Sequence, residues 1–263
     1  MKYKTLLFFI SLFSYNAFCT ENIQLIKKIS NSIYFDDWDY SIFPHNLEEN
    51  FGKKQLQNSN DEMDANLSKT WFAKEDFHND ILSCRLKNNI SSQNGNIVFV
   101  TSKNNCPNKS KYSTTYLDYY KDVHYGYYQA RIKSASKGVN NAFWFKSYNG
   151  YEIDIAEIHS PNILNITIHK WIDGNPLSYG FIFKTKSNLS SEFHLYGIKW
   201  RTDNMIFYFD NEPILTVSGF GDNIYAGNLK LSTAVSRYSG YNSEFKIDKN
   251  MTVSNVIVAP TSE

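Results

Sequence analysis

The sequence carries almost no net charge and no basic tract. Its 263 residues include 27 Lys and Arg against 26 Asp and Glu, which leaves a formal net charge of +1. Proteins that bind nucleic acids or membrane surfaces usually carry a clustered basic excess, so neither kind of partner is indicated. The chain also lacks a His and Cys cluster with zinc-ligand spacing and a glycine-rich phosphate loop. We therefore expect no nucleic-acid partner, no metal and no other cofactor.

A long hydrophobic run is missing as well. The apolar run at residues 6–13 is too short to cross a bilayer, and no second candidate follows it. Lys2 and Lys4 precede this run and Ala17-Phe18-Cys19 follows it, which is the pattern of a secretory signal peptide. We predict that residues 1–19 are removed and that the mature protein is secreted or periplasmic, with no membrane partner. A lipoprotein signal with an acylated Cys19 is the alternative.

Cysteine is scarce, with three residues in the whole chain. Loss of Cys19 with the signal peptide would leave Cys84 and Cys106. An even pair in an exported protein predicts a disulfide, which would join the neighbours of the strand-like segment 96–101. Two buried free thiols are the alternative.

Residues 20–70 form an N-terminal extension with a weak pattern. Within it, residues 23–29 are compatible with a short helix and residues 34–38 with a first edge strand. Residues 46–68 are polar, rich in Asn, Asp, Glu and Lys, and have no apolar period. We expect a long surface loop there.

Helical periodicity is also absent from residue 71 onward. In its place are short β segments separated by turn residues such as Asn94-Gly95 and Asp173-Gly174. The predicted strands are 97–101, 126–133, 142–147, 152–159, 163–171, 179–184, 193–200, 205–209, 214–217, 229–235 and 251–258. Many short strands at this spacing favour an all-β sandwich or jelly roll over a parallel α/β sheet.

One of these strands carries an unusual density of acids. The stretch Tyr151-Glu-Ile-Asp-Ile-Ala-Glu-Ile158 places three carboxylates within six residues. On a regular strand Glu152 and Asp154 share one face, while Glu157 points to the other, the core. A one-residue bulge near Ile155 and Ala156 would bring Glu157 to the face of the other two acids.

Two carboxylates that flank a sugar bond, one ionised and one protonated, are the minimum equipment for glycoside hydrolysis. Like charges on one strand face repel each other and raise each other's pKa, which makes such a cluster costly unless chemistry uses it. A solvated strand face and a calcium-binding edge are the alternatives that the spacing alone leaves open.

The motif Glu152-Ile-Asp-Ile-Ala-Glu157 resembles the signature of glycoside hydrolase family 16, in the bulged form of its laminarinase-, agarase- and carrageenase-like members. The flanking segments resemble the family in the same order, over roughly residues 71–258. They are Tyr125-Gly-Tyr-Tyr-Gln-Ala-Arg-Ile-Lys133, Ala142-Phe-Trp-Phe145, Ile166-Thr-Ile-His-Lys-Trp171, Glu192-Phe-His-Leu-Tyr-Gly-Ile-Lys-Trp200 and Met205-Ile-Phe-Tyr-Phe-Asp-Asn211. The resemblance implies a concanavalin-like β-jelly roll of two antiparallel sheets with a substrate cleft on the concave face. Residues 71–263 would then form the catalytic domain.

The resemblance also implies a role for each acid. Glu152 would be the nucleophile, Glu157 the acid/base and Asp154 the helper between them. A retaining enzyme needs its two carboxyl groups about 5–5.5 Å apart. The bulged strand and the two long Glu side chains would have to close the larger distance between their Cα atoms.

Further positions correspond to sugar-binding residues of the family. Gln129 and Arg131 alternate on one strand face, and their family counterparts line the cleft; a rim salt bridge is the alternative for Arg131. His169 and Trp171 share a face beside the catalytic strand. His169 would be a partner for the acids or a sugar hydroxyl, and Trp171 a stacking platform for a sugar ring. The alternative is that both pack in the core. Trp144 fits the core and the cleft equally well.

The chain also departs from the family pattern. Gly150 and Asn140-Asn141 stand where Trp and Trp-Pro are frequent, and Ser232 replaces a usual Asn. The thinner aromatic set weakens the glucan assignment more than the chemistry. Ser254 replaces an Asp in a region that often serves a structural calcium, so we do not predict that ion.

The expected function is a secreted, monomeric endo-β-glycanase that cleaves a polysaccharide with retention, with β-1,3- or β-1,3-1,4-glucan as the first choice of substrate. A galactan-type hydrolase, a transglycosylase and a non-catalytic carbohydrate-binding protein on the same fold are the alternatives.

Overall fold

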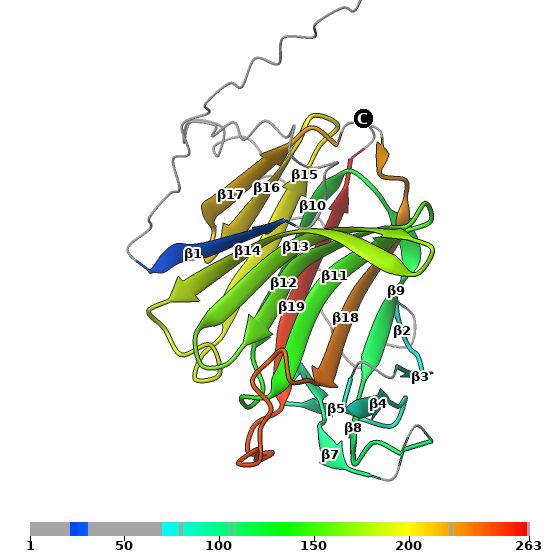
Figure 1. Cartoon of the computed structure of the whole chain (residues 1–263), viewed down its shortest axis with the longest axis vertical. Helices are drawn as coiled ribbons and strands as arrows, with labels where there is room; N and C mark the ends of the chain where they lie inside the picture. Colours follow the sequence, from blue (N-terminus) through cyan, green and yellow to red (C-terminus); the bar gives the residue numbers. More distant parts are fainter. Residues whose placement is uncertain are drawn as a thin grey trace, which may run out of the picture.

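The computed structural model describes residues 22–30, 70–78, 81–104, 106–107, 109–220 and 223–261. The predicted signal peptide with Cys19, the strand at 34–38 and the loop at 46–68 lie outside the described residues. The regular elements of the described part are β-strands (Figure 1). Within that part, no helix has the length and apolar character needed to cross a membrane.

The described residues form three sheets, and the first of them has eight strands and carries the acidic stretch (Figure 1). In spatial order its strands are β1 (Ile23–Ser30), β14 (Asn175–Thr185), β13 (Ile163–Ile172), β12 (Tyr151–His159), β11 (Val139–Ser147), β18 (Gly227–Val235), β9 (Tyr116–Val123) and β2 (Trp71–Ala73). All of its neighbours pair antiparallel.

The second sheet has seven strands. They are β17 (Glu212–Ser218), β16 (Asn204–Phe209), β15 (His194–Trp200), β10 (Gly126–Lys133), β19 (Met251–Pro260), β6 (Asn96–Phe99) and β5 (Ile90–Gln93). This sheet is also antiparallel throughout.

The core lies between these two sheets. Phe145 of β11 meets Trp200 of β15 edge to face, with ring centroids 4.9 Å apart. Ile153 and Ile155 of β12 face Tyr128 of β10 across the same interior. Strand side chains alternate between faces, so one face of the eight-stranded sheet packs into this core and the other is free to carry polar groups. The all-β, two-layer antiparallel sandwich predicted from the sequence is confirmed.

A third, small sheet, absent from the prediction, contains β3 (Asp76–Phe77), β4 (Ser83–Arg85), β8 (Tyr112–Thr114) and β7 (Ser102–Lys103). Its β4 and β8 pair in parallel, unlike the strands of the two large sheets. The predicted Cys84–Cys106 disulfide is present beside this sheet, with a Cα–Cα distance of 5.7 Å.

Residues 23–29, which are compatible with a short helix in sequence, do not form one. These residues belong to β1, which pairs antiparallel with β14 from Ile23↔Thr185 onward. Ile23 and Leu25 lie on the same face of β1 and pack against the core. The open edge of β14 provides hydrogen-bond partners for the backbone of β1. Tertiary pairing with β14 therefore decides the structure of a segment whose local sequence is also compatible with a helix.

Candidate active site

A bulge in β12 decides where the acids point. Along β11 the register steps from Phe143↔Ala156 to Trp144↔Asp154, which skips Ile155. Along β13 it steps from Asp154↔Thr167 to Glu157↔Asn165. Ile155 and Ala156 are consecutive and both belong to the core. The face alternation therefore slips by one residue, and Glu157 joins Glu152 and Asp154 on the face opposite the core. The predicted bulge is confirmed, and we call this surface of the eight-stranded sheet the site face.

Glu152 is held through a single carboxyl oxygen. Lys146 Nζ donates to its Oε2 at 2.6 Å, and Trp171 Nε1 donates to the same atom at 3.1 Å. Burial and then the charge of Asp154 raise the pKa of Glu152, while Lys146 and His169 act in the opposite direction. The predicted Trp171 thus lies on the site face, in contact with Glu152.

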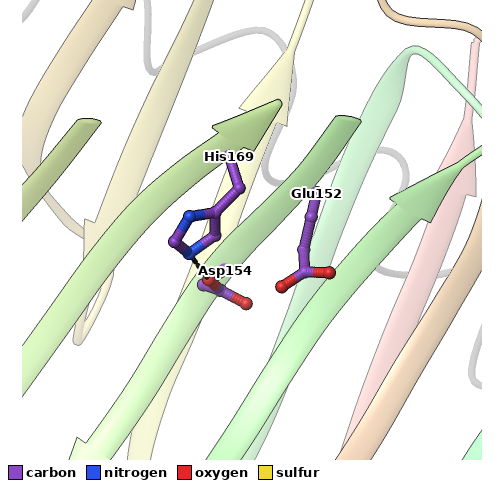
Figure 2. Close-up of side chains that lie close together, drawn as sticks. All are labelled: Glu152, Asp154 and His169. Carbon is purple, nitrogen blue, oxygen red and sulfur yellow. Dashed lines mark ion pairs between the residues drawn. The ribbon is translucent and has the colours of Figure 1, made fainter. Parts of the chain in front are cut away.

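Asp154 lies between the two glutamates and is paired with His169. Figure 2 shows the imidazole reaching Asp154 from the neighbouring strand, while Glu152 projects from the same strand as Asp154. His169 Nε2 lies 3.1 Å from Asp154 Oδ2, and its Nδ1 lies 2.5 Å from Ser178 Oγ. Burial alone would lower the pKa of His169, but the hydrogen bond and charge of Asp154 give a net rise. The predicted role of His169 as a partner of the acids therefore has a matching contact.

Glu157 sits in a different environment from Glu152. Asn140 donates an amide hydrogen to its Oε1 at 2.6 Å, and the Tyr238 hydroxyl lies 3.3 Å from its Oε2. Burial and then the charge of Asp154 raise the pKa of Glu157 to about 8, against the smaller opposing effect of the Asn140 hydrogen bond. A carboxyl group in this state keeps its proton near neutral pH and can donate it.

A second hydrogen bond orients Asn140. His159 Nε2 lies 3.1 Å from Asn140 Oδ1, and His159 Nδ1 lies 3.1 Å from the side-chain nitrogen of Asn165. Burial lowers the pKa of His159 to about 4, so this imidazole is neutral in ordinary conditions. A neutral ring can donate to Asn140 Oδ1, which leaves the Asn140 amide hydrogens for Glu157.

Trp144 lies on the site face rather than in the core. It is paired in register with Asp154, and its Nε1 donates to Ser232 Oγ at 3.1 Å. Its ring stacks on Tyr116 of β9 with an interplanar angle of 20°. Lys230 Nζ lies 5.3 Å from the centre of the Trp144 ring and donates to the Tyr116 hydroxyl.

Gln129 and Arg131 do not lie with these residues. Both belong to β10 in the seven-stranded sheet, and they alternate with the core residues Tyr128 and Ala130, so they face away from the interior. Gln129 donates to the Tyr127 hydroxyl and to Asn211, and Arg131 donates to Ser254. The prediction that these two side chains line the same cleft as the acids was wrong, because their sheet forms the other layer of the sandwich.

Glu152, Asp154 and His169 also lie within reach of a common metal ion, with ligand atoms within 4.8 Å of one another. Their present contacts describe an ion-pair network instead. His169 is engaged by Asp154, and the Lys146 ammonium already neutralises Glu152. A divalent cation would have to displace or repel that ammonium, so we count none of the three as a metal ligand.

Sequence reasoning missed Asn140, Lys146 and Tyr238 as contacts of the acids. Strand parity could have revealed Lys146, because it lies two residues from Trp144 on the same face of β11. Asn140 was noted only as a departure from the family pattern. Tyr238 lies in a loop far along the chain, and no local signal indicates its contact with Glu157.

A family model described as glycosyl hydrolases family 16 matches residues 53–250. That span covers most of the chain and includes the three acids and the side chains that contact them. This chain belongs to glycosyl hydrolases family 16. The Crh-like protein CRH12 of Candida albicans is 34% identical over 95 residues, which cover 35% of this chain and 19% of that protein. Endo-1,3-1,4-beta-glycanase EglC of Rhizobium meliloti is 30% identical over 110 residues, which cover 38% of this chain and 23% of that protein.

Solved structures agree in fold with the family assignment. The laminarinase catalytic domain from Thermotoga maritima superposes with a TM-score of 0.63 at 18% identity, covering 92% of this chain and 100% of that one. The alignments to CRH12 and EglC, in contrast, span less than a quarter of those proteins. The similarity to the laminarinase supports the jelly-roll form of the sandwich.

Proposed function

We propose that this chain is a secreted or periplasmic endo-β-glycanase that hydrolyses internal β-glycosidic bonds with retention of configuration. The observation that carries the proposal is the unequal treatment of two carboxyl groups on one face. Glu152 contacts an ammonium and an indole donor, whereas Glu157 is held protonated by burial and by its neighbour Asp154. A nucleophile and an acid/base require two carboxyl groups in unequal surroundings of this kind.

In this mechanism the Glu152 carboxylate attacks the anomeric carbon, and Glu157 gives its proton to the departing glycosidic oxygen. Glu157, now ionised, then takes a proton from water, which attacks the anomeric carbon and releases Glu152. Asp154 keeps the proton on Glu157 by its charge, and His169 keeps Asp154 in place. Asn140 fixes the orientation of the Glu157 carboxyl group.

The proposed substrate is a β-1,3- or β-1,3-1,4-linked glucan. EglC is named for 1,3-1,4-β-glycanase activity, and the Thermotoga maritima structure is a laminarinase. Trp144 and Trp171 on the site face offer rings on which a pyranose can stack. An extracytoplasmic location fits the Cys84–Cys106 disulfide, because such bonds persist mainly in oxidising compartments.

A reducing-sugar assay over laminarin, lichenan, agarose and carrageenan tests this function. We expect release of oligosaccharides from laminarin or lichenan, with a fast fall in viscosity that marks internal cleavage. Activity confined to agarose or carrageenan would overturn the glucan assignment but would still support an endo-glycanase activity. A folded protein inactive on every polymer would overturn the enzyme itself.

The two proton states also predict a bell-shaped pH profile. Activity needs ionised Glu152, so kcat/KM should rise as the pH rises through the pKa of that group. Activity also needs protonated Glu157, so kcat/KM should fall as the pH rises through about 8. Initial rates on the best polymer across a broad pH range measure both limbs. A rate that stays level well above that pH would contradict the assignment of Glu157 as the acid.

A further inference from the structure

The two donors that hold Glu152 use the same oxygen. Lys146 Nζ and Trp171 Nε1 both contact Oε2, at 2.6 and 3.1 Å. Within the described residues, Oε1 accepts no hydrogen bond. A carboxylate held in this way has one engaged oxygen and one free oxygen, and the free oxygen is the one that can form a new bond.

The position of Lys146 is set by three neighbouring strands. Lys146 of β11 is directly paired in register with Glu152 of β12. Its ammonium also lies 4.6 Å from the centre of the Trp171 ring on β13. Its side chain is 33% exposed, so the contact with Glu152 is only partly screened by water. Two independent contacts therefore hold the ammonium against Oε2.

The charges around Glu152 show that the Lys146 ammonium affects whether Glu152 is ionised. Glu152 shares β12 with Asp154 and Glu157, and His169 faces it from β13. On the other side Lys230 of β18 also acts on it, but Lys230 is paired with Asp118 of β9. Burial and Asp154 disfavour the ionised form of Glu152, and Lys146 is the cation in direct contact that favours it.

We propose that Lys146 is a positioning residue for the double displacement: it keeps Glu152 ionised and fixed through Oε2, directs the attack through Oε1, and favours release of the same carboxylate in the second step. This inference rests on the proposed function and assigns Lys146 a role in both of its steps.

The bonds and charges of the two displacement steps show why the rates of both steps should depend on Lys146. In the first step Oε1 bonds to the anomeric carbon, the glycosidic bond breaks, and the proton of Glu157 goes to the leaving oxygen. The carboxylate charge is lost in the resulting ester, and Lys146 faces a neutral group. In the second step water bonds to the anomeric carbon, its proton goes to Glu157, and the ester bond breaks to restore the charge. A nearby cation stabilises the departing carboxylate, so its removal should slow this step most.

The test compares Lys146→Met with Lys146→Arg, and with Lys133→Met as a matched control. Lys133 also lies over an aromatic ring, 5.1 Å from the centre of Phe193, but it belongs to the seven-stranded sheet. With an activated aryl β-glycoside, the acidic limb of the kcat/KM profile of Lys146→Met should move up by about one pH unit or more. The same variant should show a larger burst of aryl alcohol followed by a slower steady rate. Lys146→Arg should recover most of both effects, and Lys133→Met should match the wild type.

A second measurement does not depend on turnover. The ¹³C titration of the Glu152 carboxyl group, assigned by comparison with Glu152→Gln, should occur at higher pH in Lys146→Met than in the wild type. Unchanged titration, or an acidic limb and burst equal to the wild type, would overturn the role of Lys146. If the wild type cleaves no glycoside, the proposed function fails, while the titration still decides whether Lys146 controls the ionisation of Glu152. Lys146→Gln replaces the Met variant if the latter does not fold.

Discussion

Glu152→Gln is expected to lower kcat by about four orders of magnitude or more, because no neighbouring group can replace a missing nucleophile. The substitution is nearly isosteric and removes the repulsion between Glu152 and the charge of Asp154, so the protein should remain folded. Its Oε1 can still accept the hydrogen bond of Trp171 in place of Oε2. Rates on the best polymer, with circular dichroism of the same samples, measure the loss.

The product of chemical rescue identifies the role of the lost group. Azide can attack the anomeric carbon of an activated β-glycoside directly when no carboxylate nucleophile competes for it. With Glu152→Gln one displacement occurs, so the azide product should have the α configuration. Glu212→Gln is a suitable control, because Glu212 is an exposed glutamate at the start of β17 in the other sheet. A β-azide product, or near-normal rates, would show that Glu152 is not the nucleophile.

Glu157→Ala is expected to lose about two to four orders of magnitude on polysaccharide, the usual contribution of a general acid/base. A sugar alkoxide is a poor leaving group unless it is protonated, whereas an activated phenolate leaves with little help. The variant should therefore still form the glycosyl-enzyme from an aryl glycoside and stall there. Stopped-flow measurement of aryl release should show a burst followed by a very slow phase.

Azide should accelerate that slow phase and give a β product, because two displacements restore the original configuration. The Glu157→Gln variant should behave in the same way while keeping the hydrogen bond from Asn140. If Glu157→Ala keeps near-wild-type activity on polysaccharide, the bulge does not place Glu157 where it can act as the acid/base. An α-azide product would equally contradict the roles given to the two glutamates.

The strand that carries the acids was predictable because its signals are local. Alternation of Ile153 and Ile155 with acids sets the face, and the spacing to Glu157 requires a slip in register. The structure has that slip, with Ile155 and Ala156 both turned inward. Turn residues and short apolar runs likewise predicted strands such as β10 and β15 almost to the residue.

The features that the sequence did not predict depend on which sheet a strand joins or which distant segment it contacts. Gln129 and Arg131 alternate as cleft residues would, but alternation does not say which sheet a strand joins. Residues 23–29 form an edge strand because β14 leaves an edge to pair with, a fact that is not local to the segment. Tyr238 reaches Glu157 from a position 81 residues away, beyond any motif.

The central claim is that the bulged strand presents Glu152 as the nucleophile of a retaining mechanism. Mass spectrometry of the protein after treatment with an activated 2-deoxy-2-fluoro-β-glycoside of a matching glucan oligosaccharide tests it most directly. The fluorine slows both steps, and the good leaving group lets the first proceed, so a stable glycosyl-enzyme should accumulate. Peptide mapping should place one sugar on Glu152 in the wild type and none in Glu152→Gln. A label on another residue, or active enzyme that forms no covalent adduct, would contradict this account.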